Sequence, residues 1–509
     1  MAPDRLDDIT ETMVVVCRRS GEVVVSPLHA IYYDTPDRQL LAQRAVLRVR
    51  RTPSGQVQTL KAGNGLSRGE WEWPVTGSVP DLTVIAEAGA QAVIAGLDAA
   101  LLVPMFETRF ERRAVLLDQG AIELAVDRGE IIGPDGSIAP ISEIELELKA
   151  GESADLYRLA QALADSVPLW IEPRSKAARG FALAAHEPPG PVKAQRIPFG
   201  PATTVDSAMA AILGACFGQF TANLPCVLAG DDPEGIHQAR VGLRRLRSAL
   251  SLFRSLLPQT QTAWLGCETR WLAGILGPAR DWDVFLSELA APVREAFIVH
   301  PELHADLTML EEAALAQRHL AGEVAREALL SPRHTAFQLQ FGEWLESRGW
   351  RAQPVTPVSA RLFRPLEELA GPLLDRRHRK ARRTGAHFAE LPYPLRHLLR
   401  IALKKLRYAV DFFRARYDER QVGPYLEQLG AFQDTLGHLN DVATAARLVP
   451  KLDCAPATAA SLERAMGIVI GWHGRALALR ERQLIAEWEE FRSAKPFWVR
   501  PGHGDRRST

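Results

Sequence analysis

Two basic segments of the chain carry cations at a spacing suited to binding a polyanion. The first runs from His237 to Arg247 and the second from His397 to Arg407, 160 residues later. In an α-helix, positions 0, 3, 7 and 10 share an arc of about 80°. Each segment is therefore expected to present one cationic stripe. The stripes are His237, Arg240, Arg244 and Arg247, and His397, Arg400, Lys404 and Arg407.

The same offset persists beyond the stripes, which indicates a duplicated structural unit. Phe253 has its counterpart in Phe413, and Asp281 has its counterpart in Asp441. Two stripes related by internal symmetry predict one groove for a long polyanion. We expect the two aspartates to orient the basic side chains through charge-assisted hydrogen bonds.

A basic run over residues 376–383 precedes the second stripe. On its own, such a run is more often a solvated surface or a nucleic-acid patch. Beside the stripes, we expect Arg379 and Lys380 to extend the groove. Nucleic acid is a weaker alternative, because base stacking needs exposed aromatic side chains, and Tyr408 is the aromatic residue within the stripes.

Carboxylates alternate along one strand-like segment of the first part of the chain. Glu143, Glu145, Glu147 and Lys149 would share one strand face, with apolar residues on the other. Three neighbouring carboxylates repel one another unless cations lie between them. Such a strand is either an exposed face or the wall of a metal-binding cavity.

Other strand-like segments repeat this pattern with either sign of charge. The pairs are Arg48 with Arg50, Arg109 with Arg113, Glu70 with Glu72, and Glu123 with Asp127. A closed barrel lined by both signs would suit a metal-bound polyphosphate, since carboxylates hold Mg²⁺ or Mn²⁺ and guanidinium groups hold phosphate oxygens. The alternative is that these are the polar outer faces of an antiparallel sheet.

The elements that must position these residues differ along the chain. Residues 1 to about 80 alternate with period two, and from about residue 205 the period is 3.6. Between them we expect a helical stretch near 82–103, strands near 107–118, 121–131 and 141–149, a helix near 152–165, and a last strand. The predicted fold is an α+β multidomain chain, an antiparallel β tunnel or barrel followed by an all-α bundle with internal duplication. The predicted bounds are 1–187 for the tunnel, 188–204 for a linker, 205–495 for the bundle with repeats at about 205–300 and 365–460, and 496–509 for a tail.

Composition separates the two parts by charge. The 509 residues have a formal net charge of zero, but residues 1–190 hold 19 Lys and Arg against 27 Asp and Glu, and the remainder holds 42 against 34. This asymmetry indicates one part suited to cations and another suited to anions. The five cysteines are scattered without a CxxC pair, which favours reduced thiols and argues against a zinc site. With no signal peptide and no membrane-spanning run expected, we predict a cytoplasmic protein.

Several segments of the first part resemble the CYTH domain of triphosphate tunnel metalloenzymes. They are residues 32–37 (YYDTPD), 47–51 (LRVRR), 58–61 (QTLK), 143–149 (EIELELK) and 174–176 (RSK). The resemblance covers about residues 28–185 and implies an eight-stranded antiparallel tunnel that binds a triphosphate and a divalent metal, Mg²⁺ or Mn²⁺.

The resemblance also implies roles for individual side chains. Phosphate ligands would be Arg48, Arg50, Lys61, Arg109, Arg113, Arg174 and Lys176. Metal ligands would be Glu70, Glu143, Glu145 and Glu147. Among these, Glu145, Glu147 and Lys61 would be catalytic, in metal-assisted attack of water on the terminal phosphorus.

The chain departs from the family at its start. CYTH domains begin with an ExExK strand, whereas residues 9–16 here are ITETMVVV. With part of the metal cage missing, phosphate binding could survive without hydrolysis.

The duplicated basic segments resemble the CHAD domain, a helical module known for binding inorganic polyphosphate. The resemblance covers about residues 205–490 and includes a second repeated motif, at residues 276–283 (LGPARDWD) and 436–441 (LGHLND). It implies inorganic polyphosphate or tripolyphosphate as the partner, rather than a membrane or nucleic acid. Two functions remain open: a polyphosphate-binding inorganic triphosphatase, or a non-catalytic polyphosphate-binding protein. Nucleotide cyclases also occur among CYTH relatives, but no base pocket is recognisable in the sequence.

Overall fold

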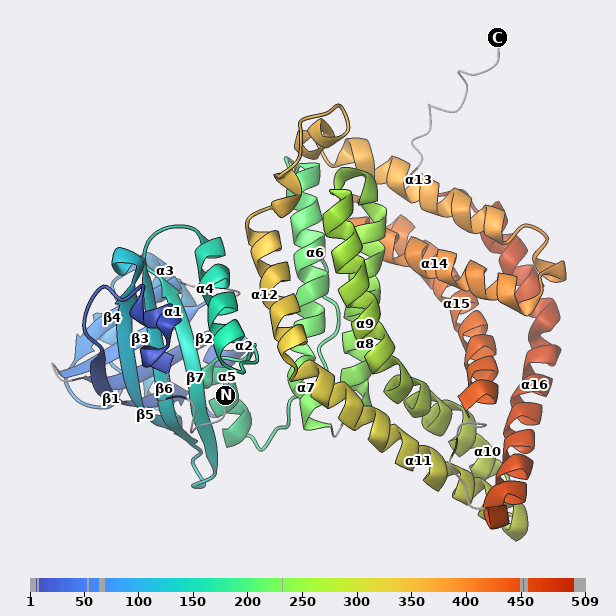
Figure 1. The fold of residues 1–509 in the computed structure, drawn as a ribbon, viewed down its shortest axis with the longest axis horizontal. Helices are drawn as coiled ribbons and strands as arrows, with labels where there is room; N and C mark the ends of the chain where they lie inside the picture. The colour runs from blue at the N-terminus through green and yellow to red at the C-terminus, as the bar shows by residue number, and fades with distance from the viewer. Residues whose placement is uncertain are drawn as a thin grey trace. The chain divides into compact units, whose positions relative to one another are not determined.

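The computed structural model describes residues 6, 9–52, 55–63, 69–230, 232–448, 452 and 456–498. Most of the predicted tail at 496–509 lies outside these residues. The chain forms two compact units. The sheet unit comprises Met1–Gly190 with Leu330–Ser347, and the helical unit comprises Pro191–Leu329 with Arg348–Thr509. Figure 1 labels their elements along the chain.

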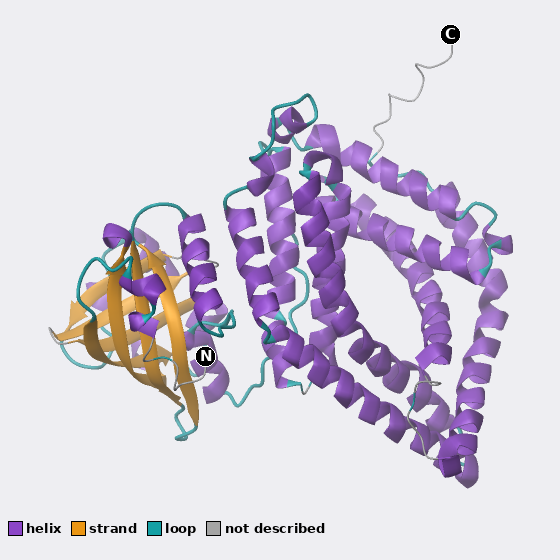
Figure 2. Cartoon of the chain, viewed as in Figure 1, coloured by secondary structure: helices purple, strands orange, loops and turns teal. Residues whose placement is uncertain are grey.

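The sheet unit is built on seven antiparallel strands, shown in orange in Figure 2. Their order across the sheet is β4-β3-β2-β1-β5-β6-β7. The strands are β1 Val24–Asp34, β2 Ala45–Thr52, β3 Gly55–Ala62, β4 Gly69–Val75, β5 Val103–Leu117, β6 Ile122–Ile132 and β7 Ile138–Leu148.

Two sequence-based expectations about this sheet need correction. An eight-stranded tunnel was expected, whereas the described residues form seven strands with β4 and β7 at the two edges. A last strand was also expected after the helix near 152–165. That helix is α4 (Ser153–Ser166), and the element that follows it is another helix, α5 (Lys176–Ala184). The Ser175 side chain caps α5 by accepting a hydrogen bond from the Ala178 amide, so the segment starts a helical turn here.

Alternation along the strands gives the sheet two different faces. On the apolar face, Leu159 and Leu163 of α4 pack against Leu124 of β6. Over the other half of the same face, Ala90 of α3 (Ala88–Val93) packs against Leu47 of β2. The opposite side, here called the charged face, carries Arg48, Arg50, Lys61, Asp127, Glu143 and Glu145, as the strand register places them.

Helix α5 covers the apolar end of the charged face. The Phe181 ring packs edge-on against Phe106 of β5, with ring centroids 5.1 Å apart. At Gly180 a Cβ atom would lie 2.1 Å from the Phe106 ring, so only glycine allows this close approach. The packing fixes the start of α5, where Lys176 lies, above β6 and β7.

Helix α12 (Pro332–Glu346) completes the sheet unit although it lies far along the chain. It packs on α4, where Gly342 lies against the Tyr157 ring. Glu343 accepts hydrogen bonds from Arg158 at 3.1 Å and from Gln161 at 3.0 Å. The sequence-based boundaries assigned this helix to the bundle, because its helical periodicity carries no information about which partner it packs against.

The helical unit contains the remaining long helices, with short 3₁₀ turns between some of them. They are α6 Val205–Ala222, α7 Leu224–Ala229, α8 Pro233–Leu252, α9 Gln259–Val284, α10 Ala291–Ala296, α11 Pro301–Leu329, α13 Glu367–Thr384, α14 Tyr393–Phe413, α15 Glu419–Leu448 and α16 Pro456–Ser493, with a π-helical turn at Phe285–Ala290. The short helices α1 (Met13–Val16) and α2 (Gln39–Ala42) belong to the sheet unit.

The predicted duplication is confirmed by the helix order. Helix α8 packs against α6 and α9, and α14 packs in the same way against α13 and α15. A 3₁₀ turn follows each basic helix, at Arg254–Leu256 and at Arg414–Arg416. The equivalent residues Phe253 and Phe413 contact each other edge-on, with ring centroids 6.5 Å apart. The two repeats therefore meet at equivalent positions.

One described segment, Val205–Ala229, is long and apolar enough to cross a membrane by composition alone, although the sequence analysis expected none. More than half of its most apolar window is buried within the protein, as in a core helix.

Candidate functional site

Three carboxylates converge on the charged face where β6 and β7 pair. Asp127 lies opposite Glu143 in the register, and Glu145 lies two residues further along β7. One oxygen from each of the three lies within 4.8 Å of the others. We call Asp127, Glu143 and Glu145 the acidic triad.

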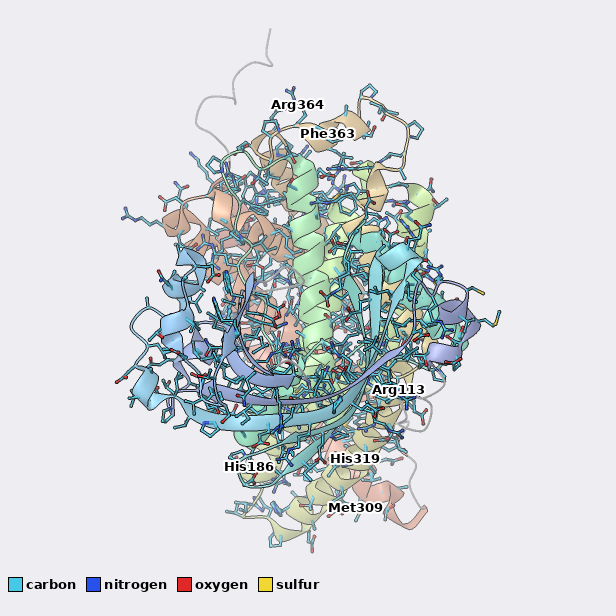
Figure 3. All side chains as sticks on the ribbon, turned by 90° about the vertical axis from the view of Figure 1, so that its left-hand side faces the viewer. Arg113, His186, Met309, His319, Phe363 and Arg364 are labelled. Atoms are coloured by element: carbon cyan, nitrogen blue, oxygen red, sulfur yellow. The ribbon has the colours of Figure 1, made fainter. Side chains whose placement is uncertain are left out.

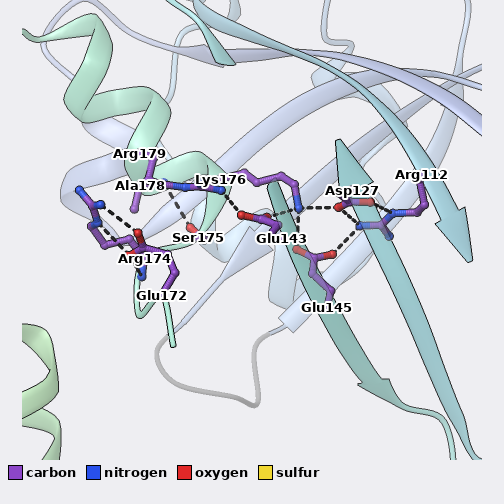
Figure 4. Close-up of polar contacts among 10 residues, drawn as sticks. All are labelled: Arg112, Asp127, Glu143, Glu145, Glu172, Arg174, Ser175, Lys176, Ala178 and Arg179. Carbon is purple, nitrogen blue, oxygen red and sulfur yellow. Dashed lines mark hydrogen bonds and ion pairs between the residues drawn. The ribbon is translucent and has the colours of Figure 1, made fainter. Parts of the chain in front are cut away.

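Lys176 lies at the centre of the acidic triad, as Figure 4 shows. Its ammonium nitrogen is 2.7 Å from an Asp127 oxygen and 2.8 Å from a Glu145 oxygen, and it also pairs with Glu143. The side chain is 9% exposed. Burial opposes its charge, but the triad outweighs burial and raises the pKa of Lys176.

Two arginines complete the ion pairing. Arg112 of β5 donates two hydrogen bonds to Asp127, at 2.7 and 2.8 Å, and also pairs with Glu145. Arg179, one turn after Lys176 on α5, pairs with Glu143. Burial alone would raise the pKa of Glu145, but Lys176 and Arg112 lower it to about 2. Three cations thus neutralise three carboxylates.

The cations of β2 and β3 line the other side of the charged face. Lys61 pairs with Glu70 of β4 at 2.8 Å, and Arg50 reaches Glu72 at 3.6 Å. The Nε atoms of Arg48 and Arg50 are buried without a hydrogen-bond partner among the described residues. Burial, followed by the neighbouring Arg48, lowers the pKa of Arg50. These guanidinium groups therefore retain capacity to bind an anion.

Two predicted tunnel residues lie away from the charged face altogether. The register places Arg109 and Arg113 on the opposite face, because β5 presents Phe110 and Arg112 on the charged face. Arg109 pairs with Glu107 and Arg113, labelled in Figure 3, pairs with Glu111. The prediction that Arg109 and Arg113 lie on the same face of the sheet as Arg48 and Arg50 is therefore wrong, because the inward-facing positions of β5 are shifted by one residue.

Arg174 and Glu147 do lie near the end of the charged face but have other partners. Arg174 makes two hydrogen bonds to Glu172, both at 3.0 Å, apart from the triad in Figure 4. Glu147 pairs with Lys149 at 2.8 Å and is 64% exposed. Neither belongs to the acidic triad.

The acidic triad fits a divalent cation in its donor chemistry. Carboxylate oxygens are the ligands that Mg²⁺ and Mn²⁺ prefer, and the three oxygens converge closely enough to share one ion. The Lys176 ammonium already takes the position of a cation there. A metal would therefore have to displace it, and the freed ammonium would need an anionic partner.

In the helical unit, the two predicted stripes come together. The inner members of both stripes are half-buried, and the fourth member of each, Arg247 and Arg407, is exposed. We call the half-buried stripe residues that interact electrostatically with Lys404 or His237, together with these two, the central cluster. It consists of His237, Arg240, Arg244, Arg400 and Lys404.

The electrostatics show that these side chains face one another. Burial, then Arg400 and Arg244, lower the pKa of Lys404 to about 7. Burial, then Arg280, lower the pKa of His237 to about 4. Cations held this close, in a half-buried place, indicate a site that an anion would stabilise.

In the first repeat the aspartate forms an ion pair with a stripe residue, at a distance too long for the predicted hydrogen bond. Arg240 lies 3.7 Å from Asp281 and donates a hydrogen bond of 3.0 Å to the Leu276 carbonyl. A Cβ atom at Gly277 would lie 3.2 Å from the Arg240 guanidinium, so the glycine of the repeated motif leaves room for it. In the second repeat, the side-chain oxygen of Asn440 accepts a hydrogen bond of 2.8 Å from Nδ1 of His397.

Other basic residues of the helical unit are either exposed or buried in the core. Arg379 is exposed and pairs with Asp375 at 2.9 Å. Lys380 is exposed and lies close enough to Lys405 to lower its pKa. His378 is buried between Phe491 and Trp498, which identifies it as a core residue.

The sequence analysis missed several residues of these sites. Arg112 was passed over because three charges follow one another at residues 111–113, and the alternation does not say which faces inward. Asp127 was noted as half of a carboxylate pair but not assigned to the metal set. Arg179 had a usable signal, since it lies three residues after Lys176 on the same helical face.

Comparisons with known proteins identify two domains in the chain. The CYTH domain model matches residues 17–181 and the CHAD domain model matches residues 211–450. An inorganic triphosphatase of Haemophilus influenzae is 34% identical over 169 residues, which cover 31% of this chain and 46% of that protein. The chain thus spans less than half the length of this curated relative.

A solved structure extends the comparison for the helical unit. The crystal structure of the CHAD domain from the plant Ricinus communis is 30% identical, with a TM-score of 0.50, and the match covers 60% of this chain and 98% of that domain. The chain therefore belongs to the CHAD family and carries a CYTH domain followed by a CHAD domain.

Proposed function

We propose that the CYTH domain is a metal-dependent inorganic triphosphatase acting on tripolyphosphate or on polyphosphate ends. The observation that carries this proposal is the charged face, where the acidic triad and two arginines with buried Nε atoms that have no described partner lie on the same side of one sheet. Such a surface offers carboxylates to Mg²⁺ or Mn²⁺ and cations to phosphate oxygens. The resemblance to an inorganic triphosphatase supports the same substrate class.

The chain's own residues would divide the work by charge. Arg48, Arg50 and Lys61 bind the phosphate chain, and Glu145 with the rest of the acidic triad holds the metal. When bound, the metal supplies a Lewis acid and a water of lowered pKa for attack on the terminal phosphorus. Lys176, released from the triad, donates hydrogen bonds to the phosphoryl oxygens. Glu70 and Glu147, predicted as further metal ligands, are paired with lysines and would have to exchange partners first.

The alternative is a CYTH domain that binds triphosphate without hydrolysing it. One observation favours it: Lys176 fills the centre of the triad, where a metal would have to bind. Phosphate release distinguishes the two functions.

The first test is release of phosphate from tripolyphosphate with Mg²⁺ or Mn²⁺, comparing the full-length protein with Glu145→Ala. Metal-dependent turnover that falls at least about a hundredfold in the variant supports the enzyme. Glu111→Gln, on the opposite face, is the matched control and should retain turnover. Absent turnover with tripolyphosphate still bound would establish the non-catalytic alternative.

We further propose that the CHAD domain binds inorganic polyphosphate through the central cluster, extended by Arg247, Arg407 and the basic run at Arg379 and Lys380. Side chains from both repeats meet there, as binding along a polymer requires. The absence of stacked aromatics among them favours a phosphate chain over a nucleic acid. A cytoplasmic location, where metabolic phosphates are present, is part of this proposal.

Salt dependence tests the binding proposal. A site contacting many phosphates releases many counterions, so affinity for long-chain polyphosphate should fall steeply with salt, as it does for nucleic acids with a logarithmic slope of about 0.7–0.9 per contact. Arg244→Gln with Lys404→Gln should weaken binding while leaving tripolyphosphate turnover unchanged. Affinity that does not respond to salt would refute the proposed site.

A further inference from the structure

The duplication of the CHAD domain is broken at one buried ion pair. Arg245 of α8, in the first repeat, pairs with Asp411 of α14, in the second. The guanidinium is 6% exposed and lies 5.2 Å from the Phe412 ring. Applying the 160-residue offset in both directions, Arg245 corresponds to Lys405, and Asp411 corresponds to Ser251. The equivalent position pair, Lys405 with Ser251, thus keeps the cation and lacks the carboxylate.

A second cation has taken the place next to Ser251. Arg377 of α13 donates a hydrogen bond of 3.1 Å to the Ser251 hydroxyl. Its Nε atom is buried and has no partner among the described residues. Burial, then the neighbouring Arg376, lower the pKa of Arg377 to about 10. A neutral hydroxyl does not compensate a buried guanidinium.

Lys405 lies in the same region and also has no negative charge to compensate it. It is half-buried, and the structure gives it no hydrogen bond or ion pair with a described residue. After burial, the groups that lower the pKa of Lys405 are Arg377, Arg247 and Lys380, all of them cations. Arg247 in turn has Arg270 as its charged neighbour. Cations from α8, α13 and α14 therefore converge at the position equivalent to the neutral Arg245–Asp411 pair.

We propose that Lys405, Arg377 and Arg247 form a second anion site, which binds one phosphoryl group carrying two negative charges. The anion supplies the charge that Asp411 supplies to Arg245. Lys405 is one residue from Lys404 and so lies about 100° around α14 from the central cluster. The site shares Arg247 with the surface proposed for the polymer, whereas Lys405 and Arg377 lie outside that surface.

The proposal is tested by restoring the lost symmetry with Ser251→Asp. The new carboxylate would pair with Arg377 and Lys405, so the variant should unfold at a temperature no lower than the wild type. Binding of inorganic phosphate, measured by calorimetry on the full-length protein without metal, should weaken at least about tenfold. Lys405→Gln should weaken it similarly and covers the case in which the aspartate variant does not fold. Gln421→Glu adds the same charge at an exposed position of α15 and is the control.

Two outcomes distinguish free orthophosphate from the end of a phosphate chain as the source of the phosphoryl group. If only orthophosphate binding is lost in Ser251→Asp, the occupant is free phosphate. If tripolyphosphate binding is lost and orthophosphate does not bind the wild type, the occupant is a chain end. Equal affinity of both ligands for the variant and the wild type would overturn the proposal. Ser251→Asp leaves the central cluster intact and should retain most of the affinity for long-chain polyphosphate, so failure of one proposal is distinguishable from failure of the other.

Discussion

Lys404 should make polyphosphate binding depend on pH in the neutral range. Its pKa in the free protein is about 7, lowered first by burial and then by Arg400 and Arg244. Asp441 opposes this shift, and Arg240 adds to it. A bound polyanion compensates these cations and removes the repulsion that lowers the pKa. In the complex, the lysine pKa should return towards its ordinary value of about 10.4.

The size of the effect follows from the difference between the two pKa values. Below pH 7 Lys404 is protonated in both states, so it contributes no pH dependence. Above pH 7 the complex binds about one proton more than the free protein, so the dissociation constant should rise about tenfold per pH unit. Between pH 6 and pH 9 the loss of affinity should reach about a hundredfold, or about 2.7 kcal/mol.

Calorimetry with long-chain polyphosphate measures both the affinity and the proton uptake. Titrations at pH 8 in two buffers of different ionisation enthalpy should report uptake of about one proton. Lys404→Arg is the matched control, because arginine remains charged throughout this range. It should bind with nearly constant affinity from pH 6 to 9. The same pH dependence in Lys404→Arg as in the wild type would refute the assignment to this lysine.

Two glycine substitutions, each with a control, test the packing around the sites. Gly342→Ala should destabilise the sheet unit by about 1–3 kcal/mol, since its Cβ would lie 2.2 Å from the Tyr157 ring. The control Gly322→Ala, in open space on α11, should be neutral or stabilising by up to about 1 kcal/mol in the same thermal unfolding assay. Unfolding unchanged by Gly342→Ala would contradict the α4–α12 packing. Gly277→Ala should weaken polyphosphate binding about threefold to tenfold by shifting the Arg240 guanidinium, whereas its counterpart Gly437→Ala has open space and should bind like the wild type. Equal effects of the two would show that the room left for Arg240 is irrelevant.

The helical stripes could be predicted because one periodicity governs them. A residue's direction on a helix follows from its number, so His237, Arg240 and Arg244 had to share a face once the helix was assigned. The constant offset then placed Arg400 and Lys404 in the equivalent position. Ser251 and Arg377 could not be predicted in the same way, because their meeting depends on how α13 packs against α8.

The strands show where such prediction ends. Alternation along β5 allows two assignments of faces, and a shift of one residue exchanges them all. The charged run at residues 111–113 gives no apolar pattern to decide between them, so Arg113 was chosen and Arg112 is the residue beside Asp127. The acidic residues of β7 alternate with leucine and isoleucine, and their face was fixed by that pattern. Lys176 was identified by its motif, but its position among the carboxylates needed the helix start at Ser175.

The two domains hold their cations in opposite states, and this difference should order their use of a phosphate chain. On the charged face, Arg112, Lys176 and Arg179 are already paired with the acidic triad. A phosphate that binds these cations leaves the carboxylates without an ion-pair partner. A metal that binds the carboxylates likewise leaves the cations without one. Each of these steps alone leaves buried charge uncompensated, so the two ligands should enter together. In the central cluster, by contrast, the cations repel one another before any ligand arrives. Binding of a polyanion without a metal relieves this repulsion and is therefore favourable by itself. The CHAD domain is thus suited to capture the polymer, and the CYTH domain to accept a chain end that brings its own cation.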